Sequence, residues 1–276
     1  MITIPDPHVL AQKLVEKPWG RTHLPPQFEA LGDRRIGEIW FEPPAQCPEL
    51  LVKYIFTSEN LSVQVHPNDA QTLAKGLGKQ GKEECWLVLS AEPGAKLGIG
   101  FHGQIDEDRM RAAAMDGSIK DQMVWHEVVA GDFFYIPANT VHAIGAGVTL
   151  LEVQQNSDIT YRLYDYGRPR ELHLDDGIAV ALGETYDLSR WHRHVDLNGG
   201  TIALVDGPYF RMDHVVDSLN DDLLRRYGNG PVLVVPLKGG IWAGKDKLVP
   251  GTCAMVSHAD QLGLGDDDAA LVIQSL

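Results

Sequence analysis

Short apolar runs separated by turn residues are the feature that most restricts the fold of this chain. The sequence contains 28 glycines and 16 prolines, and the runs between them are rich in β-branched and aromatic side chains, as strands are. Helical patterns are confined to 68–74, 106–116 and 172–182. The sequence therefore predicts an all-β protein with a few short helices and strands at 37–41, 50–57, 84–89, 132–136, 149–155, 202–204, 232–237 and 253–256.

A glycine turn followed by an apolar strand occurs twice along the chain. One copy begins at Gly131 and a second, with a similar rhythm, begins at Gly251. We interpret the two copies as parts of two related β-barrels, of which the second lacks the histidine-rich chemistry of the first. The predicted organisation is a catalytic domain with an N-terminal arm over 1–170, a linker helix region over 171–195, and a degenerate second barrel over 196–276.

Charge and cysteine content argue against several classes of protein. The formal net charge is −14 without a basic stripe, whereas nucleic-acid binders usually carry one. No apolar run approaches the ~20 residues that span a bilayer, and the N-terminus lacks a signal-peptide pattern, so we expect a cytoplasmic protein without a membrane partner. The three cysteines form no Cys-x-x-Cys pair, and any bound metal should therefore have nitrogen and oxygen ligands.

Two segments carry polar side chains that share one face of a predicted strand. Gln64 and His66 are two residues apart, as are Lys82 and Glu84, and residues at this spacing point the same way in a strand. Histidine is the commonest metal-binding side chain, and Glu84 could add a carboxylate while Lys82 reaches a substrate anion. Taken alone, each segment is more typical of an ordinary strand with a charged edge.

A third segment is more specific. A strand that begins after Gly131 ends at Pro137, a turn follows, and His142 opens the next strand. This arrangement resembles the second sequence motif of cupin barrels, in which the histidine completes a metal site. The resulting candidate ligands are two imidazoles, a carboxylate and an amide oxygen: Gln64, His66, Glu84 and His142.

Such a ligand set leaves coordination positions for water or substrate, which is typical of catalytic rather than structural metals. Without thiolates, zinc fits, and iron, manganese or cobalt could bind the same four groups. We therefore predict one divalent metal, with zinc as the first choice.

Cations and a carboxylate follow the third segment. Glu152 lies about one strand-length after His142, and Arg162 and Arg168 are spaced as two cations around a loop. Arginine suits planar, bidentate recognition of a phosphate or of an enediolate. The alternative for both arginines is ordinary salt bridging at the surface.

These segments together resemble the type I phosphomannose isomerase family, in its short bacterial form, within the cupin superfamily. The string Gln-Val-His-Pro-Asn-Asp at 64–69 is the most specific of them. The resemblance implies two cupin barrels with one zinc ion, held by the four candidate ligands. The matching stretches are 16–20, 37–40, 51–53, 61–69, 82–86, 136–142 and 156–162.

The resemblance also implies an activity, the interconversion of mannose 6-phosphate and fructose 6-phosphate through a cis-enediol(ate). By this resemblance, Lys82 is an active-site lysine, Arg162 the catalytic arginine and Arg168 a phosphate-binding residue. The metal would act as a Lewis acid, and Arg162 would stabilise the enediolate. Glu152, Asp158 or a water on the metal would carry the proton between C1 and C2, while Lys82 and Arg168 hold the phosphate.

Three other functions compete with this one. A cupin dioxygenase could use iron at the same site, although Lys82, Arg162 and Arg168 argue against it, because oxygenases of apolar substrates need no phosphate cradle. A sugar-phosphate-binding cupin could bind without turnover. An isomerase could also act on another phosphorylated aldose.

Overall fold

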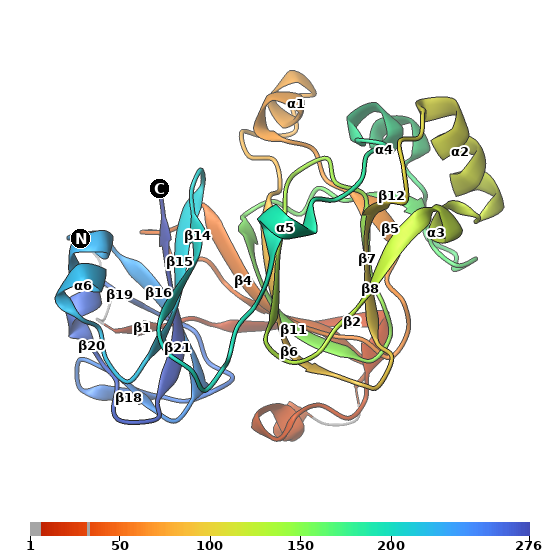
Figure 1. Cartoon of the computed structure of the whole chain (residues 1–276). Helices are drawn as coiled ribbons and strands as arrows, with labels where there is room; N and C mark the ends of the chain where they lie inside the picture. The colour runs from red at the N-terminus through yellow and green to blue at the C-terminus, as the bar shows by residue number, and fades with distance from the viewer. Residues whose placement is uncertain (1–6, 32–33) are drawn as a thin grey trace.

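The computed structural model describes residues 7–31 and 34–276, so residues 1–6 of the predicted N-terminal arm and residues 32–33 lie outside the described residues. Two halves built from β-sheets lie side by side (Figure 1). The first half contains a seven-stranded and a five-stranded sheet, and the second a six-stranded and a three-stranded sheet. The predicted all-β fold with few short helices is confirmed.

The two sheets of the first half are antiparallel throughout. The seven-stranded sheet has the order β13 (His192–His194), β9 (Asp132–Ile136), β6 (Glu84–Ala91), β11 (Val148–Gln155), β4 (Leu50–Phe56), β3 (Ile36–Phe41) and β2 (Gln12–Arg21). The five-stranded sheet has the order β12 (Tyr161–Tyr164), β5 (Val63–Val65), β10 (His142–Ile144), β7 (Lys96–Phe101) and β8 (Met123–Glu127).

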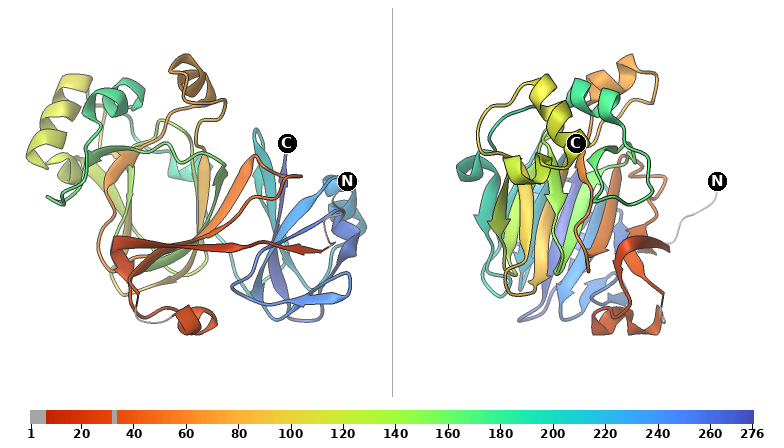
Figure 2. Two further views of the ribbon diagram at one scale, coloured as in Figure 1. Left: turned by 180° about the vertical axis from the view of Figure 1, so that it is seen from behind. Right: turned by 90° about the vertical axis from the view of Figure 1, so that its right-hand side faces the viewer.

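The second half begins with a strand from the start of the chain. Its six-stranded sheet has the order β1 (His8–Val9), β19 (Ala254–Val256), β16 (Val232–Lys238), β21 (Ala269–Ser275), β15 (Phe210–Val216) and β14 (Ile202–Asp206). Its three-stranded sheet has the order β18 (Asp246–Leu248), β17 (Ile241–Ala243) and β20 (Leu262–Gly263). Figure 2 shows the N-terminal segment, in red, running across from this half to the seven-stranded sheet.

The helices are short, and three of them stand over one rim of the first half (Figure 1). Asn68 and Asp106 cap α1 and α2, each accepting a hydrogen bond from the backbone N–H three residues on. None of the helices in the described part of the chain is long and apolar enough to cross a membrane. The helices are α1 (Asp69–Ala74), α2 (Glu107–Asp116), α3 (Ile119–Gln122), α4 (Leu174–Val180), α5 (Leu188–Trp191) and α6 (Asp221–Tyr227), with 3₁₀ turns η1 (Pro26–Leu31) and η2 (Ala259–Gln261).

Two elements of the predicted linker region, 171–195, extend the first half. Helix α4 packs on β12 and α2, and β13 pairs with β9 at the edge of the seven-stranded sheet. The domain boundaries at 170 and 195 stay a prediction.

The strands of the seven-stranded sheet separate two cores. Cys85 and Leu87 belong to a core shared with the six-stranded sheet, to which Leu233 and Ile273 contribute. Alternate residues point to the other face, so Trp86 lies in the core between the two sheets of the first half. Glu84 is buried two residues before Trp86 on β6, so it points to the same inner side of the sheet.

Candidate active site

Two cross-strand rows face each other inside the first barrel. On the five-stranded sheet, Gln64 lies opposite His142 on one side and opposite Arg162 on the other. On the seven-stranded sheet, Glu152 lies opposite Lys53 on one side. Side chains directly opposite on antiparallel strands share a face, so sheet pairing alone gathers groups from five segments of the sequence.

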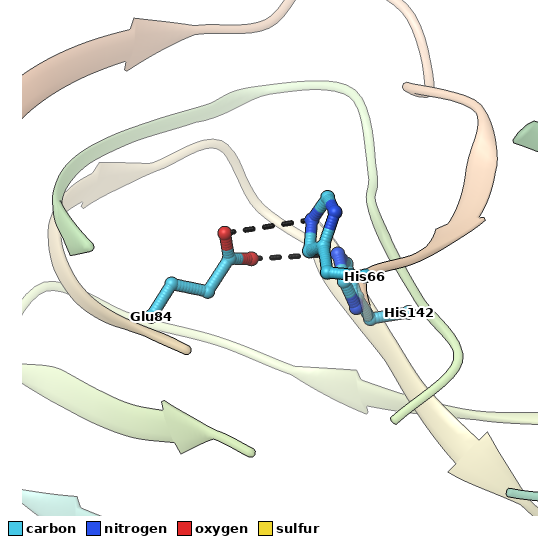
Figure 3. Close-up of side chains that lie close together, drawn as sticks. All are labelled: His66, Glu84 and His142. Atoms are coloured by element: carbon cyan, nitrogen blue, oxygen red, sulfur yellow. Dashed lines mark ion pairs between the residues drawn. The ribbon is translucent and has the colours of Figure 1, made fainter. Parts of the chain in front are cut away.

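His66, Glu84 and His142 form the core of the site (Figure 3). Their donor atoms lie within 4.8 Å of one another, and no other such group occurs among the residues that the structure describes. The Nε2 atom of His66 is 3.6 Å from Glu84 Oε2, and that of His142 is 3.4 Å from Glu84 Oε1. All three side chains are buried. Two imidazoles and a carboxylate in this arrangement could hold a metal ion.

Backbone carbonyls orient both imidazoles. His66 Nδ1 is 2.9 Å from the carbonyl of Ile159, and His142 Nδ1 is 2.9 Å from the carbonyl of Thr140. A carbonyl only accepts, so Nδ1 carries the proton in each ring and the Nε2 lone pair points into the site. Burial lowers the pKa of His142 to about 4 and that of His66 well below its usual range. Both rings are therefore neutral near pH 7, as metal ligands must be.

Glu84 shows that the site suits a cation. Both carboxylate oxygens are buried, and neither accepts a well-directed hydrogen bond from the described residues. The nearest positive group is Lys82, whose Nζ lies 2.9 Å from Oε2 and 3.1 Å from His66 Nε2. Burial and the negative charge of Glu152 raise the pKa of Glu84 to about 7. A divalent metal would satisfy both oxygens and favour the ionised carboxylate.

Gln64 completes the candidate ligand set after a rotation of its amide. Its Nε2 is 3.3 Å from His142 Nε2, and its Oε1 accepts a hydrogen bond of 3.1 Å from the hydroxyl of Ser62. A half-turn of the amide would direct Oε1 at the site, and Nε2 would then donate to the Ser62 hydroxyl. The four groups predicted as ligands are thus brought together, and they fit a metal with nitrogen and oxygen ligands.

A cavity of about 600 Å³ lies beside this group, lined by Gln64 and Lys82, which contact His142 and His66. Its wall is unusually rich in charged side chains of both signs, which suits a small polar substrate rather than an apolar one. Its lining consists of Lys17, Trp19, Glu38, Trp40, Lys53, Ile55, Leu61, Ser62, Gln64, Lys82, Ile144, Glu152, Asp158, Thr160, Arg162, Arg170, Glu171 and His173.

Glu152 is the most tightly held carboxylate of the cavity. Its oxygens accept hydrogen bonds of 2.9 Å from Lys53 Nζ and from the indole N–H of Trp86. Burial alone would raise the pKa of Glu152, but Lys53 and Lys82 outweigh burial and lower the pKa to about 2. Glu152 is therefore a fixed negative charge near neutral pH, whereas Asp158 lines the same cavity from an exposed position.

Arg162 and Lys82 also line the cavity, as predicted for groups that contact an anion. The Arg162 guanidinium lies 3.4 Å from the carbonyl of Glu171 and 3.4 Å from His173 Nδ1. Burial and the neighbouring Arg170 lower the pKa of Arg162.

Arg168 is placed differently from the other predicted residues. It is absent from the cavity lining, and its guanidinium donates to Asp165, to Glu59 and to the carbonyl of Asn60. Of these two neighbouring arginines, it is Arg170 that lines the cavity, and Arg170 also donates to Asp165. The phosphate-binding role of Arg168 stays a prediction, and Arg170 is a second candidate for it.

Sequence reasoning missed Lys53, although the signal was present. The strand Leu50–Phe56 is buried along its whole length, and Lys53 is its only charged residue. A lysine is almost never fully buried without a partner, so its position predicts a buried carboxylate opposite. No comparable signal marks Lys17 or Glu38, because the pairing of β2 with β3 brings them to the cavity.

Sequence comparison identifies relatives for about half of the chain. No family model matches. The chain is 40% identical over 170 residues to a mannose-6-phosphate isomerase of Streptococcus mutans, covering 58% of this chain and 52% of that protein. It is 42% identical over 137 residues to a mannose-6-phosphate isomerase of Bacillus subtilis, covering 48% of this chain and 43% of that protein. This chain is thus similar in sequence to mannose-6-phosphate isomerases. It spans about half the length of the curated relatives it matches.

Solved structures extend the likeness of fold to nearly the whole chain. The structure of the mannose 6-phosphate isomerase from Bacillus subtilis matches 98% of this chain and 100% of that chain, with a TM-score of 0.77 and 21% identity. A putative mannosephosphate isomerase from Archaeoglobus fulgidus matches 100% and 99%, with a TM-score of 0.77 and 18% identity. The predicted cupin-type fold, and the resemblance to the phosphomannose isomerases, are confirmed.

Proposed function

We propose that this protein interconverts mannose 6-phosphate and fructose 6-phosphate, with zinc as its metal and the cytoplasm as its location. The observation that carries the proposal is the contact of the His66, Glu84 and His142 group with Gln64 and Lys82, which line a cavity together with Lys53 and other cations. A sugar phosphate needs both features, because its carbonyl end requires an electrophile and its phosphate end a positive surface.

The proposed mechanism assigns a task to each group. Gln64, His66, Glu84 and His142 would hold the metal, which when bound supplies Lewis acidity at the sugar oxygens. Arg162 would stabilise the negative charge of the enediolate. Glu152 and Asp158 are the candidate side chains for carrying the proton between C1 and C2. The low pKa of Glu152 favours a fixed negative charge at that residue, so Asp158 is the better candidate for the proton carrier.

The proposal is tested by a coupled assay of mannose 6-phosphate isomerisation on chelated protein and on the same protein reloaded with zinc. We expect chelation to lower turnover by about 10³-fold, because several kcal/mol of charge stabilisation is lost, and zinc to restore it. Oxygen consumption and turnover of other phosphorylated aldoses are measured in parallel. Folded, reloaded protein that isomerises none of these sugars would contradict the proposal and favour a sugar-phosphate-binding protein.

The phosphate end of the cavity is tested by comparing Arg168→Met with Arg170→Met. Both variants remove one cation from Asp165 and leave the other in place. Arg168→Met also removes the contacts with Glu59 and the Asn60 carbonyl, so Tm is measured beside KM for both variants. A hydrogen bond to a charged group is worth about 1.5–3 kcal/mol, so losing the phosphate-binding arginine should raise KM by about 10- to 100-fold. We expect this rise in Arg170→Met. The role implied by the resemblance predicts it in Arg168→Met instead.

A further inference from the structure

Trp86 touches two parts of the candidate site without lining the cavity. It lies on β6 opposite Glu152 of β11, and its side chain is fully buried behind the cavity wall. Its indole N–H donates to Glu152 Oε2 over 2.9 Å. Its ring and the ring of His142 form a T-shaped pair, with centroids 5.4 Å apart and planes at 73°. One side chain thus contacts both a carboxylate of the cavity and a candidate metal ligand.

The hydrogen bond from Trp86 provides a donor for the second carboxylate oxygen of Glu152. The other carboxylate oxygen, Oε1, accepts from Lys53 Nζ at 2.9 Å, so each oxygen has one donor from a different strand. Lys53 sits on a flexible stem and its Nζ also donates to Gln154, whereas the indole is rigid and locked in the core. The indole N–H is therefore the donor that sets the plane of the carboxylate.

We propose that Trp86 is a positioning residue of the isomerase reaction, which orients Glu152 through its N–H and holds the His142 ring by aromatic packing. This inference rests on the proposed function. One contact is a hydrogen bond and the other is a contact between rings, so substitution separates them. Phenylalanine keeps an aromatic ring beside His142 and removes the N–H, while leucine removes both.

The test compares zinc-loaded Trp86→Phe and Trp86→Leu with the wild type. For Trp86→Phe we expect zinc affinity and KM within about twofold of wild type and a kcat lower by about 10- to 100-fold, the weight of one hydrogen bond to a charged group. Trp86→Leu should in addition bind zinc more weakly. The control is Trp125→Phe, which removes an indole N–H bond of 2.8 Å to the carbonyl of Lys120, outside the cavity. It should keep the wild-type kcat at a similar loss of Tm.

Two results would overturn the inference. One is a Trp86→Phe protein with the kcat of the wild type. The other is a joint fall of kcat, zinc content and Tm in Trp86→Phe that also occurs in Trp125→Phe. A purely structural role of the indole predicts this second result.

An NMR readout separates this inference from the proposed function. The indole N–H resonance of Trp86, assigned by its absence in Trp86→Phe, should shift in Glu152→Gln, because a charged acceptor becomes a neutral one. An unshifted resonance would mean that the contact does not hold Glu152 and would overturn the inference. A shifted resonance in a protein that isomerises no sugar phosphate would instead leave the contact established and remove the proposed function.

Discussion

The His142→Ala variant is expected to lose its metal and at least about 10³-fold in kcat/KM on mannose 6-phosphate. His142 presents its Nε2 to Glu84, and its removal takes away one of only two imidazoles in the candidate ligand set and leaves a weak amide oxygen among the three ligands that remain. Zinc content after dialysis and steady-state kinetics measure the two effects.

The matched control is His214→Ala. His214 is equally buried, but it lies on β15 in the second half, outside the metal-binding group. It should lower Tm while zinc content and kcat stay near the wild-type values. Full zinc content in His142→Ala would contradict the ligand assignment, and a loss of zinc in both variants would attribute the effect to general destabilisation.

Glu152→Gln is expected to lower the free energy of unfolding by about 3 kcal/mol at pH 7. This difference from the wild type should become smaller as the solution becomes acidic. The folded pKa of Glu152 is lowered to about 2 from an ordinary value of 4.5. Its ionised form therefore stabilises the fold above pH 4.5, and this stabilisation is lost as the pH falls toward 2. About half of the difference between the two proteins should be gone at pH 3.

Urea unfolding of wild type and Glu152→Gln from pH 7 to pH 3 measures this difference. Glu171→Gln is the control, because Glu171 also lines the cavity but is exposed. That variant should match the wild type at every pH. A difference between wild type and Glu152→Gln that stays constant with pH would mean that Lys53 does not hold an ionised carboxylate at this position.

The sequence predicted those features that local chemistry determines. The strand at Asp132–Ile136 was located correctly, because Gly131 turns the chain before it and Pro137 has no N–H to continue the ladder. The helices predicted from Asn68 and from Asp106 are present, and those two side chains cap them. The candidate ligands were ordinary when each segment was taken alone, and only the resemblance of the segments together to a known family marked them as a set.

Features that depend on strand pairing were beyond the sequence. The contact of Lys53 with Glu152 joins residues 99 positions apart, and only the register of β4 on β11 creates it. Arg168 and Arg170 lie in a loop after β12, where no strand periodicity indicates which of them faces the cavity. The path of the chain start to the second half was also missed, because the two-residue strand at His8–Val9 is too short for any pattern.

The position of β1 in the six-stranded sheet has a consequence for folding during synthesis. His8 pairs with Met255 and Val9 with Ala254, so the partner of the earliest described strand is translated much later than that strand. Closing so long a loop is entropically costly, and pairings between distant residues form slowly. We expect β1 to join the six-stranded sheet as one of the last steps of folding. Until it does, β19 is an open edge of the sheet, the kind of edge that favours unwanted pairing with neighbouring chains.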